Sequence, residues 1–169
     1  MTIWTIVAGG VGVIALLGAG TLLLPKNVHV ERQARVSASP ETILELAASN
    51  HGFQKFNPYL TSDPELKIRP FGPDAGVGSG FHFDGREGKG TQTVAQVTAN
   101  SVRYDIDLGA MGKPVQEISA QSLPGGTQVT WTMDMDLGFN PIARVFGLFL
   151  DGMVGKTFEQ GLDNLASAT

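Results

Sequence analysis

The sequence contains no cysteine and only three histidines. Without cysteine the chain can form no disulfide, no zinc–thiolate or iron–sulfur site, and no thiol nucleophile. His29, His51 and His82 are far apart, and none has a carboxylate at metal-ligand spacing on a predicted helix, so we expect no metal. The glycines at 76, 78 and 80 precede a predicted strand rather than a helix, which argues against a phosphate-binding loop. We therefore expect no cofactor.

The sequence also lacks any excess of positive charge. Its net charge is −4, and every charged side chain lies beyond residue 25. This balance argues against nucleic acid as a partner, because nucleic-acid binding requires a basic patch. It also argues against purely electrostatic binding to anionic lipid. The oligomeric state stays open.

What the chain has instead is an uncharged, predominantly apolar run from Ile3 to Leu24. A run of about 18 or more such residues is typical of a transmembrane helix. A cleaved signal peptide is the alternative, but it would have a basic residue before the run, and here the first one is Lys26. We predict an uncleaved anchor over residues 1–26 and a separate domain over 27–169. Removing 1–26 should leave a folded, soluble and monomeric domain.

The basic residues that follow the run favour one orientation. Lys26, Arg32 and Arg35 come soon after it, and no Lys or Arg precedes it. The positive-inside rule then places the domain on the cytoplasmic side of the membrane.

The domain itself reads as an α+β chain. A loosely alternating strand over residues 28–36 precedes a helix that begins at Ser39-Pro40 and a short aromatic, helical segment over 50–64. About six strands follow up to Leu137, separated by short turns that favour antiparallel pairing. Of these, residues 129–137 alternate most clearly between apolar and polar side chains.

The last predicted element is a long helix that begins at Asn140-Pro141, a capping residue followed by a residue suited to the first turn. Its apolar side chains form two stripes rotated by about 135° from each other. We predict a bend or break between Asp151 and Lys156, beside Gly152 and Gly155, with the first half acting as a lid over a cavity and the second gripping the sheet. The alternative is a continuous helix whose first half is covered by residues 50–64.

No catalytic signature is visible. The sequence has no recognisable Ser–His–Asp arrangement, and the paired carboxylates Asp105/Asp107 and Asp134/Asp136 lie opposite the apolar residues of their predicted strands. They therefore fit a solvated face of the sheet better than an acid–base pair.

Several local runs give the chain a family resemblance: residues 30–41, Phe53 to Tyr59, Gly72-Pro73, residues 76–78, 129–134 and 147–162. The chain resembles the SRPBCC, or START-like, superfamily, and most closely its polyketide cyclase/dehydrase and lipid-transport proteins. The resemblance implies a helix-grip fold, in which a curved sheet of about seven strands surrounds a long C-terminal helix. It further implies a deep apolar cavity that binds lipids, sterols, polyketides or hormones, with chemistry in a minority of members.

Given this resemblance, bulky apolar residues are candidates for lining such a cavity, although packing in an ordinary core accounts for them equally well. The candidates are Phe53, Phe56, Tyr59, Phe81, Phe83, Trp131, Met133, Phe146, Phe149, Leu150 and Met153. We expect a membrane-tethered domain that binds a lipid or another apolar small molecule in a cavity between the sheet and the C-terminal helix. The alternatives are a cyclase- or hydrolase-type enzyme that uses His82, Arg86 or Tyr104, and an interaction module with a filled core.

Overall fold

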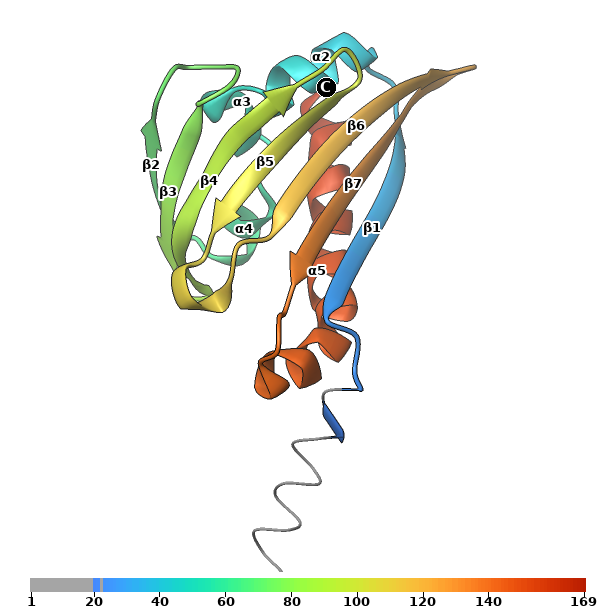
Figure 1. The fold of residues 1–169 in the computed structure, drawn as a ribbon. Coiled ribbons are helices and arrows are strands. Elements are labelled where there is room, and N and C mark those ends of the chain that lie inside the picture. Colours follow the sequence, from blue (N-terminus) through green and yellow to red (C-terminus); the bar gives the residue numbers. More distant parts are fainter. Residues whose placement is uncertain (1–19, 22) are drawn as a thin grey trace, which may run out of the picture.

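The computed structural model of the protein describes residues 20, 21 and 23–169. Seven strands and a long C-terminal helix dominate this part of the chain (Figure 1). In chain order the elements are β1 (Asn27–Val36), α2 (Pro40–Ala47), α3 (Asn50–Gln54), α4 (Pro58–Ser62), β2 (Lys67–Phe71), β3 (Gly80–Gly85), β4 (Gly88–Val97), β5 (Ser101–Asp107), the 3-10 helix η1 (Gly109–Met111), β6 (Val115–Leu123), β7 (Gly126–Asp136) and α5 (Pro141–Ala168).

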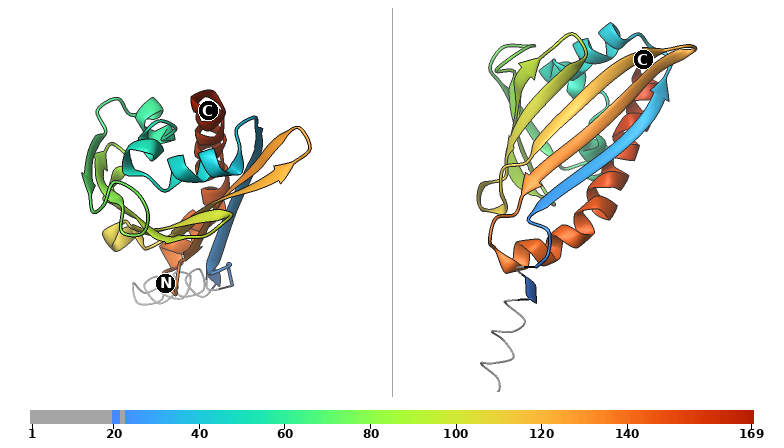
Figure 2. Two further views of the ribbon diagram at one scale, coloured as in Figure 1. Left: turned by 90° about the horizontal axis from the view of Figure 1, so that it is seen from above. Right: turned by 45° about the vertical axis from the view of Figure 1, so that its right-hand side comes forward.

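The strands form one antiparallel sheet in the order β1-β7-β6-β5-β4-β3-β2. It is strongly curved, with α5 against β1 and β7 and with α2 and α3 closing the other side of its concave face (Figures 1 and 2). The inward residues of β7 are buried at Val129, Trp131 and Met133, as their alternation predicts. The predicted α+β class, the helix-grip architecture and the seven-stranded antiparallel sheet are confirmed.

The predicted starts of α2 and α5 are both confirmed, and in each the predicted residue caps the helix. The Ser39 hydroxyl accepts a hydrogen bond from the Thr42 amide at 3.3 Å, and the Asn140 side chain accepts from Ile142 at 3.0 Å and Ala143 at 3.2 Å. Each cap satisfies amides that the first turn of a helix leaves without a partner, and each precedes a proline.

Helix α5 is continuous from Pro141 to Ala168, so the break that we allowed for between Asp151 and Lys156 does not occur. The other form of that prediction, a bend, appears as a gradual curve of the helix (Figure 2). Its axis curves without interruption, and the first turns cross the lower end of the molecule (Figure 2). Gly155 serves close packing and does not act as a hinge. A Cβ there would lie within 2.0 Å of the Arg32 guanidinium, which bonds to Asp151 at 3.0 Å and to Glu159 at 2.8 Å.

The two stripes of α5 have different environments. The second half is buried at Phe158, Leu162 and Leu165. In the first half, by contrast, the exposed fraction is 50% for Phe146 and 61% for Phe149. The predicted lid and its alternative, coverage of the first half by residues 50–64, are therefore both wrong. That segment packs on the second half instead, where Asn164 donates a hydrogen bond to the Phe56 carbonyl at 3.4 Å.

The predicted membrane anchor, apart from its last residues, lies outside the described residues. Among residues 20, 21 and 23–169, no helix is long and apolar enough to cross a bilayer. The described chain is held to the domain from Leu24 onward, since the Leu24 carbonyl accepts a hydrogen bond from Arg144 at 3.2 Å and the Lys26 carbonyl accepts one from Leu137 at 2.7 Å.

Candidate functional site

The concave interior is filled by a cluster of aromatic rings. Phe53 lies at its centre, with ring centroids 4.8 Å from Phe56, 5.6 Å from Phe81 and 5.9 Å from Trp131. Trp131 also stacks on Phe158 of α5 at 4.6 Å. Because α3, β3, β7 and α5 each contribute a ring, this cluster joins the helices to the sheet.

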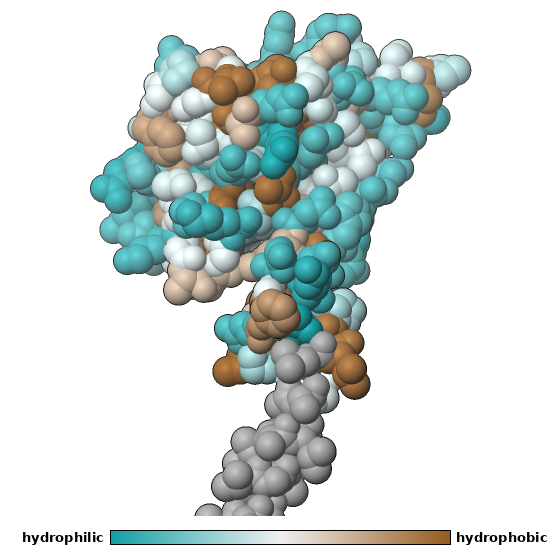
Figure 3. Space-filling model, in the orientation of Figure 1, coloured by the Kyte–Doolittle hydropathy of each residue, from teal (hydrophilic) through white to brown (hydrophobic). Residues whose placement is uncertain are grey.

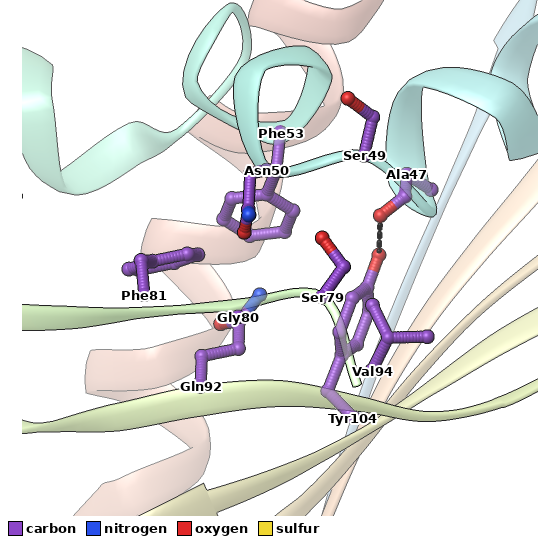
Figure 4. Close-up of a pocket in the computed structure, with 10 residues that line it drawn as sticks. All are labelled: Ala47, Ser49, Asn50, Phe53, Ser79, Gly80, Phe81, Gln92, Val94 and Tyr104. Carbon is purple, nitrogen blue, oxygen red and sulfur yellow. Dashed lines mark hydrogen bonds between the residues drawn. The ribbon is translucent and has the colours of Figure 1, made fainter. Parts of the chain in front are cut away.

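Beside this cluster lies a small void between the α2–α3 segment and strands β3 to β5 (Figure 4). No residue of α5 lines it, so this void does not lie between the sheet and the C-terminal helix, where we expected a cavity. The volume of the void is about 10 Å³, which is room for about one water molecule. The lining residues are Ala47, Ser49, Asn50, Phe53, Ser79, Gly80, Phe81, Gln92, Val94 and Tyr104. The surroundings are thus apolar and aromatic, with a few polar side chains.

The polar groups of the void come from both sides. Asn50 donates hydrogen bonds to the carbonyls of Phe71 and Pro73, each at 3.2 Å, but its buried Oδ1 has no partner among the described residues. Gln92, from β4, is buried on the opposite side. An unpaired buried acceptor costs free energy that a bound hydroxyl or amide donor could recover.

Tyr104 is the one titratable side chain that lines the void. Its hydroxyl donates to the Ala47 carbonyl at 2.8 Å (Figure 4), and burial raises the pKa of this phenol well above 10. The other proposed catalytic groups lie elsewhere. His82 is exposed with its ring 4.8 Å from Phe71, and Arg86 is 3.5 Å from Asp63. No acid–base pair therefore faces this void.

The sequence-predicted cavity residues divide into three groups. Phe53, Phe56, Phe81, Trp131, Met133 and Leu150 are buried, Tyr59 and Phe83 are partly buried, and Phe146, Phe149 and Met153 are exposed. Only Phe53 and Phe81 line the void. Burial and, to a smaller extent, Glu87 raise the pKa of Tyr59 to about 12, so this phenol stays protonated at physiological pH.

Sequence reasoning missed the polar residues of the void. Gln92 lies two positions before the buried Val94 on β4, a spacing that places both on one face of a strand. Polar neighbours on both sides conceal that alternation in the sequence. Asn50 sits at the start of a helix of five residues, too short for periodicity to show its direction.

A larger, open hollow of about 450 Å³ lies at strands β5 to β7. Charged and polar side chains of Arg103, Glu117, Thr132 and Asp134 line it together with Val115 and Gln116. This lining lacks the predominantly apolar character of small-molecule pockets. Among the described residues, no three potential ligands lie close enough to hold a metal ion.

The fold and this enclosed apolar interior define a helix-grip domain, a sheet closed around a C-terminal helix. The model of the family described as polyketide cyclase/dehydrase and lipid transport matches residues 27–169, and the chain belongs to this family, within the SRPBCC superfamily. No match was found among curated proteins.

Solved structures share the fold at low sequence identity. A norcoclaurine synthase from Thalictrum flavum, solved with a transition-state analogue, has a TM-score of 0.65 and 14% identity over 83% of this chain and 92% of its own. A protein from Chromobacterium violaceum has a TM-score of 0.59 and 17% identity over 83% and 96%. The di-domain ARO/CYC protein StfQ from the steffimycin biosynthetic pathway has a TM-score of 0.62 and 8% identity over 83% of this chain and 50% of its own. At these identities the likeness extends to the fold alone.

Proposed function

We propose that the domain binds a lipid or another apolar small molecule in its interior, between the α2–α3 segment and strands β3 to β5. The observation that carries the proposal is the unpaired, buried Oδ1 of Asn50 at a void lined by aromatic and aliphatic residues with a few other polar side chains. Such a lining, mostly apolar with a few oriented polar groups, is typical of ligand pockets. Membership in a family described by cyclase, dehydrase and lipid-transport functions supports the same class of ligand.

Binding requires the interior to expand, because ligand pockets have volumes of about 300–1,000 Å³ and the void has about 10 Å³. The loop between β2 and β3 is the segment that closes the void. Two backbone hydrogen bonds hold it to the α2–α3 junction. The backbone amide of Asn50 donates to the Asp74 carbonyl at 3.0 Å, and that of Gly76 donates to the Ala48 carbonyl at 2.8 Å. We infer that ligand entry separates this loop from that junction.

The domain is further proposed to be tethered by residues 1–26, with its soluble part facing the cytoplasm. The apolar run Ile3–Leu24 and the basic residues that follow it support this arrangement. A ligand that partitions into bilayers is then available beside the domain.

The test is a fluorescence titration of the full-length protein in neutral detergent with 11-(dansylamino)undecanoic acid. Trp4 is first replaced by phenylalanine so that Trp131 is the single energy donor. We expect saturable transfer to one probe per chain. Val94→Phe places a larger side chain in the lining of the void and should abolish the energy transfer. Val97→Phe, on the same strand but 41% exposed, should leave the transfer unchanged.

A second candidate function, an interaction module with a filled core, is favoured by the small size of the void. Equal transfer in the Val94 and Val97 variants, or no saturable transfer at all, would support that module and contradict ligand binding. The cyclase- or hydrolase-type alternative has only Tyr104 at the void to support it. Turnover that is lost in Tyr104→Phe while probe binding is retained would establish it.

A further inference from the structure

The first half of α5 carries an apolar stripe that faces away from the domain. Along the helix, residues 142, 145, 146, 149 and 153 fall on one side at about 100° per residue. Their exposed fractions are 80% for Ile142, 40% for Val145, 50% for Phe146, 61% for Phe149 and 55% for Met153. The opposite side of the same turns packs inward, where a Cβ at Gly147 would lie 2.5 Å from Leu137.

The stripe continues beyond the helix. Phe139, just before its cap, is 83% exposed, and Leu23 is 89% exposed. Figure 3 shows several hydrophobic residues at this lower end of the molecule. An exposed apolar patch of this kind marks a binding surface more often than an ordinary solvated one.

The segment that carries the stripe has almost no charge of its own. Between Leu137 and Leu150 the only charged residue is Arg144, and it is buried with its guanidinium on the carbonyls of Gly138 and Leu24. The next charge, Asp151, is paired with Arg32 at 3.0 Å. Insertion of the stripe therefore desolvates no charged side chain of residues 137–150 other than the already buried Arg144, and the exposed Lys26 and Asp136 flank it.

The position of the apolar run Ile3–Leu24 identifies the partner. The run joins the domain beside the stripe with no intervening linker, because Leu24 and Lys26 are already bonded to Arg144 and Leu137. If the run spans a bilayer, this end of the domain sits at the bilayer surface. An amphipathic helix with aromatic and aliphatic side chains on one face is suited to that interface.

We propose that the first half of α5, with Phe139, docks the domain on the lipid bilayer by inserting its apolar stripe into the headgroup–acyl boundary. The inference rests on the proposed anchor but not on ligand binding. A second copy of the chain, or residues 3–22 folded back on the stripe, are the competing occupants.

The test uses single cysteines in this cysteine-free protein, labelled with the polarity-sensitive fluorophore NBD in the full-length chain reconstituted in phosphatidylcholine vesicles. The test positions are Ile142→Cys and Phe149→Cys. The matched control is Ala166→Cys, an exposed position at the other end of the same helix. Both test labels should show a blue shift, strong quenching by spin-labelled lipid and little quenching by iodide, and the control should show the reverse.

Each other outcome identifies a different failure. Release of the protein by alkaline carbonate contradicts the proposed anchor. Retention with iodide-accessible labels at 142 and 149 overturns the docking alone. If the labels are shielded from iodide but lose this shielding as the protein is diluted with lipid, and unlabelled Phe149→Cys forms a disulfide between chains, the stripe is assigned to a second copy. Shielding without quenching by spin-labelled lipid assigns it to residues 3–22.

Discussion

Tyr104 connects the sheet to the α2 helix through one buried hydrogen bond. Its side chain is 1% exposed and donates to the Ala47 carbonyl at 2.8 Å. Tyr104→Phe removes the donor and leaves that carbonyl unpaired, so we expect the free energy of unfolding at pH 7 to fall by about 1 kcal/mol. Urea denaturation followed by circular dichroism measures the change.

The same residue predicts a dependence on alkaline pH. Burial raises the folded-state pKa of Tyr104 well above the unfolded value of 10.0. The contribution of the neutral phenol to stability is therefore complete below pH 10 and is lost as the pH rises toward the folded pKa. Tyr104→Phe should flatten this loss above pH 10. An equally steep loss in the variant would assign the alkaline unfolding to other groups.

His29 provides a second titration, at the β1–β7 pair. Its Nδ1 lies 2.7 Å from Asp134, its partner in the register, and this hydrogen bond raises the pKa of His29 above 6.5 against a smaller opposing effect of burial. Its contribution to stability is present below pH 6.5 and is lost as the pH rises through the folded-state pKa. Because both side chains are more than half exposed, the effect is small.

An NMR titration of the His29 ring tests this pair directly. Asp134→Asn removes the charge while keeping a similar shape, so the pKa of His29 should fall toward its ordinary value. The matched control is Asp136→Asn, an exposed carboxylate two residues along the same strand, which should leave it unchanged. A pKa of His29 that is the same in both variants would contradict the assignment.

At the scale of elements, the glycines of α5 separate close packing from helix propensity. Nothing lies within 4 Å of a Cβ built at Gly152, whereas one at Gly161 would lie 2.5 Å from the Trp131 ring. Gly152→Ala should raise the free energy of unfolding by up to about 1 kcal/mol. Gly161→Ala should lower it by about 1–3 kcal/mol through overpacking against a ring stacked on Phe158.

Thermal denaturation of the two variants measures this difference. Destabilisation by Gly152→Ala would indicate that the curve of α5 depends on the flexibility of residue 152, as a hinge would require. Equal effects of the two variants would contradict the packing of Trp131 on the helix.

Sequence patterns predicted the elements better than their surroundings. The alternation of β7 and the Asn140-Pro141 start of α5 are local signals, because each depends on neighbouring residues alone. The periodicity of α5 gave two stripes correctly but could not show what covers either one. Coverage depends on tertiary contacts such as Pro58 near Gly161, which bring distant segments together.

The candidate site was harder to predict from the sequence than the fold, because burial in it also depends on tertiary contacts. Phe53 and Phe81 could be selected as bulky apolar residues, but Asn50 and Gln92 carry no signal of burial in their local sequence. Phe146, Phe149 and Met153 were selected on the same ground and lie on the outer surface. Hydrophobicity alone does not distinguish a pocket, a core and a docking face.

At the scale of the whole molecule, the last residues before β1 belong to the domain. The carbonyls of Leu24 and Lys26 accept hydrogen bonds from Arg144 and Leu137. A fragment of residues 23–169 should therefore fold and be more stable than one of residues 27–169 by about 1–3 kcal/mol, since the shorter fragment removes acceptors from buried donors. Equal urea midpoints would show that these bonds contribute nothing.

The same comparison bears on the division of the chain at residue 26. We expect both fragments to show the circular dichroism of a folded α+β domain, because the core residues all lie within β1 to α5. An unfolded fragment of residues 27–169 would contradict that division. The exposed stripe of α5 revises the sequence-based expectation of a monomeric fragment. It predicts concentration-dependent association of either fragment in the absence of lipid, which sedimentation velocity detects.

Native mass spectrometry of the full-length protein, extracted from membranes in mild detergent, tests ligand binding in the interior most directly. The account predicts one tightly held apolar small molecule per chain, lost in Val94→Phe and retained in Val97→Phe, since only Val94 lines the void. Lipid bound around the predicted anchor would be the same in both variants. An adduct that is absent from the unaltered protein, or one that Val94→Phe leaves in place, would contradict the account.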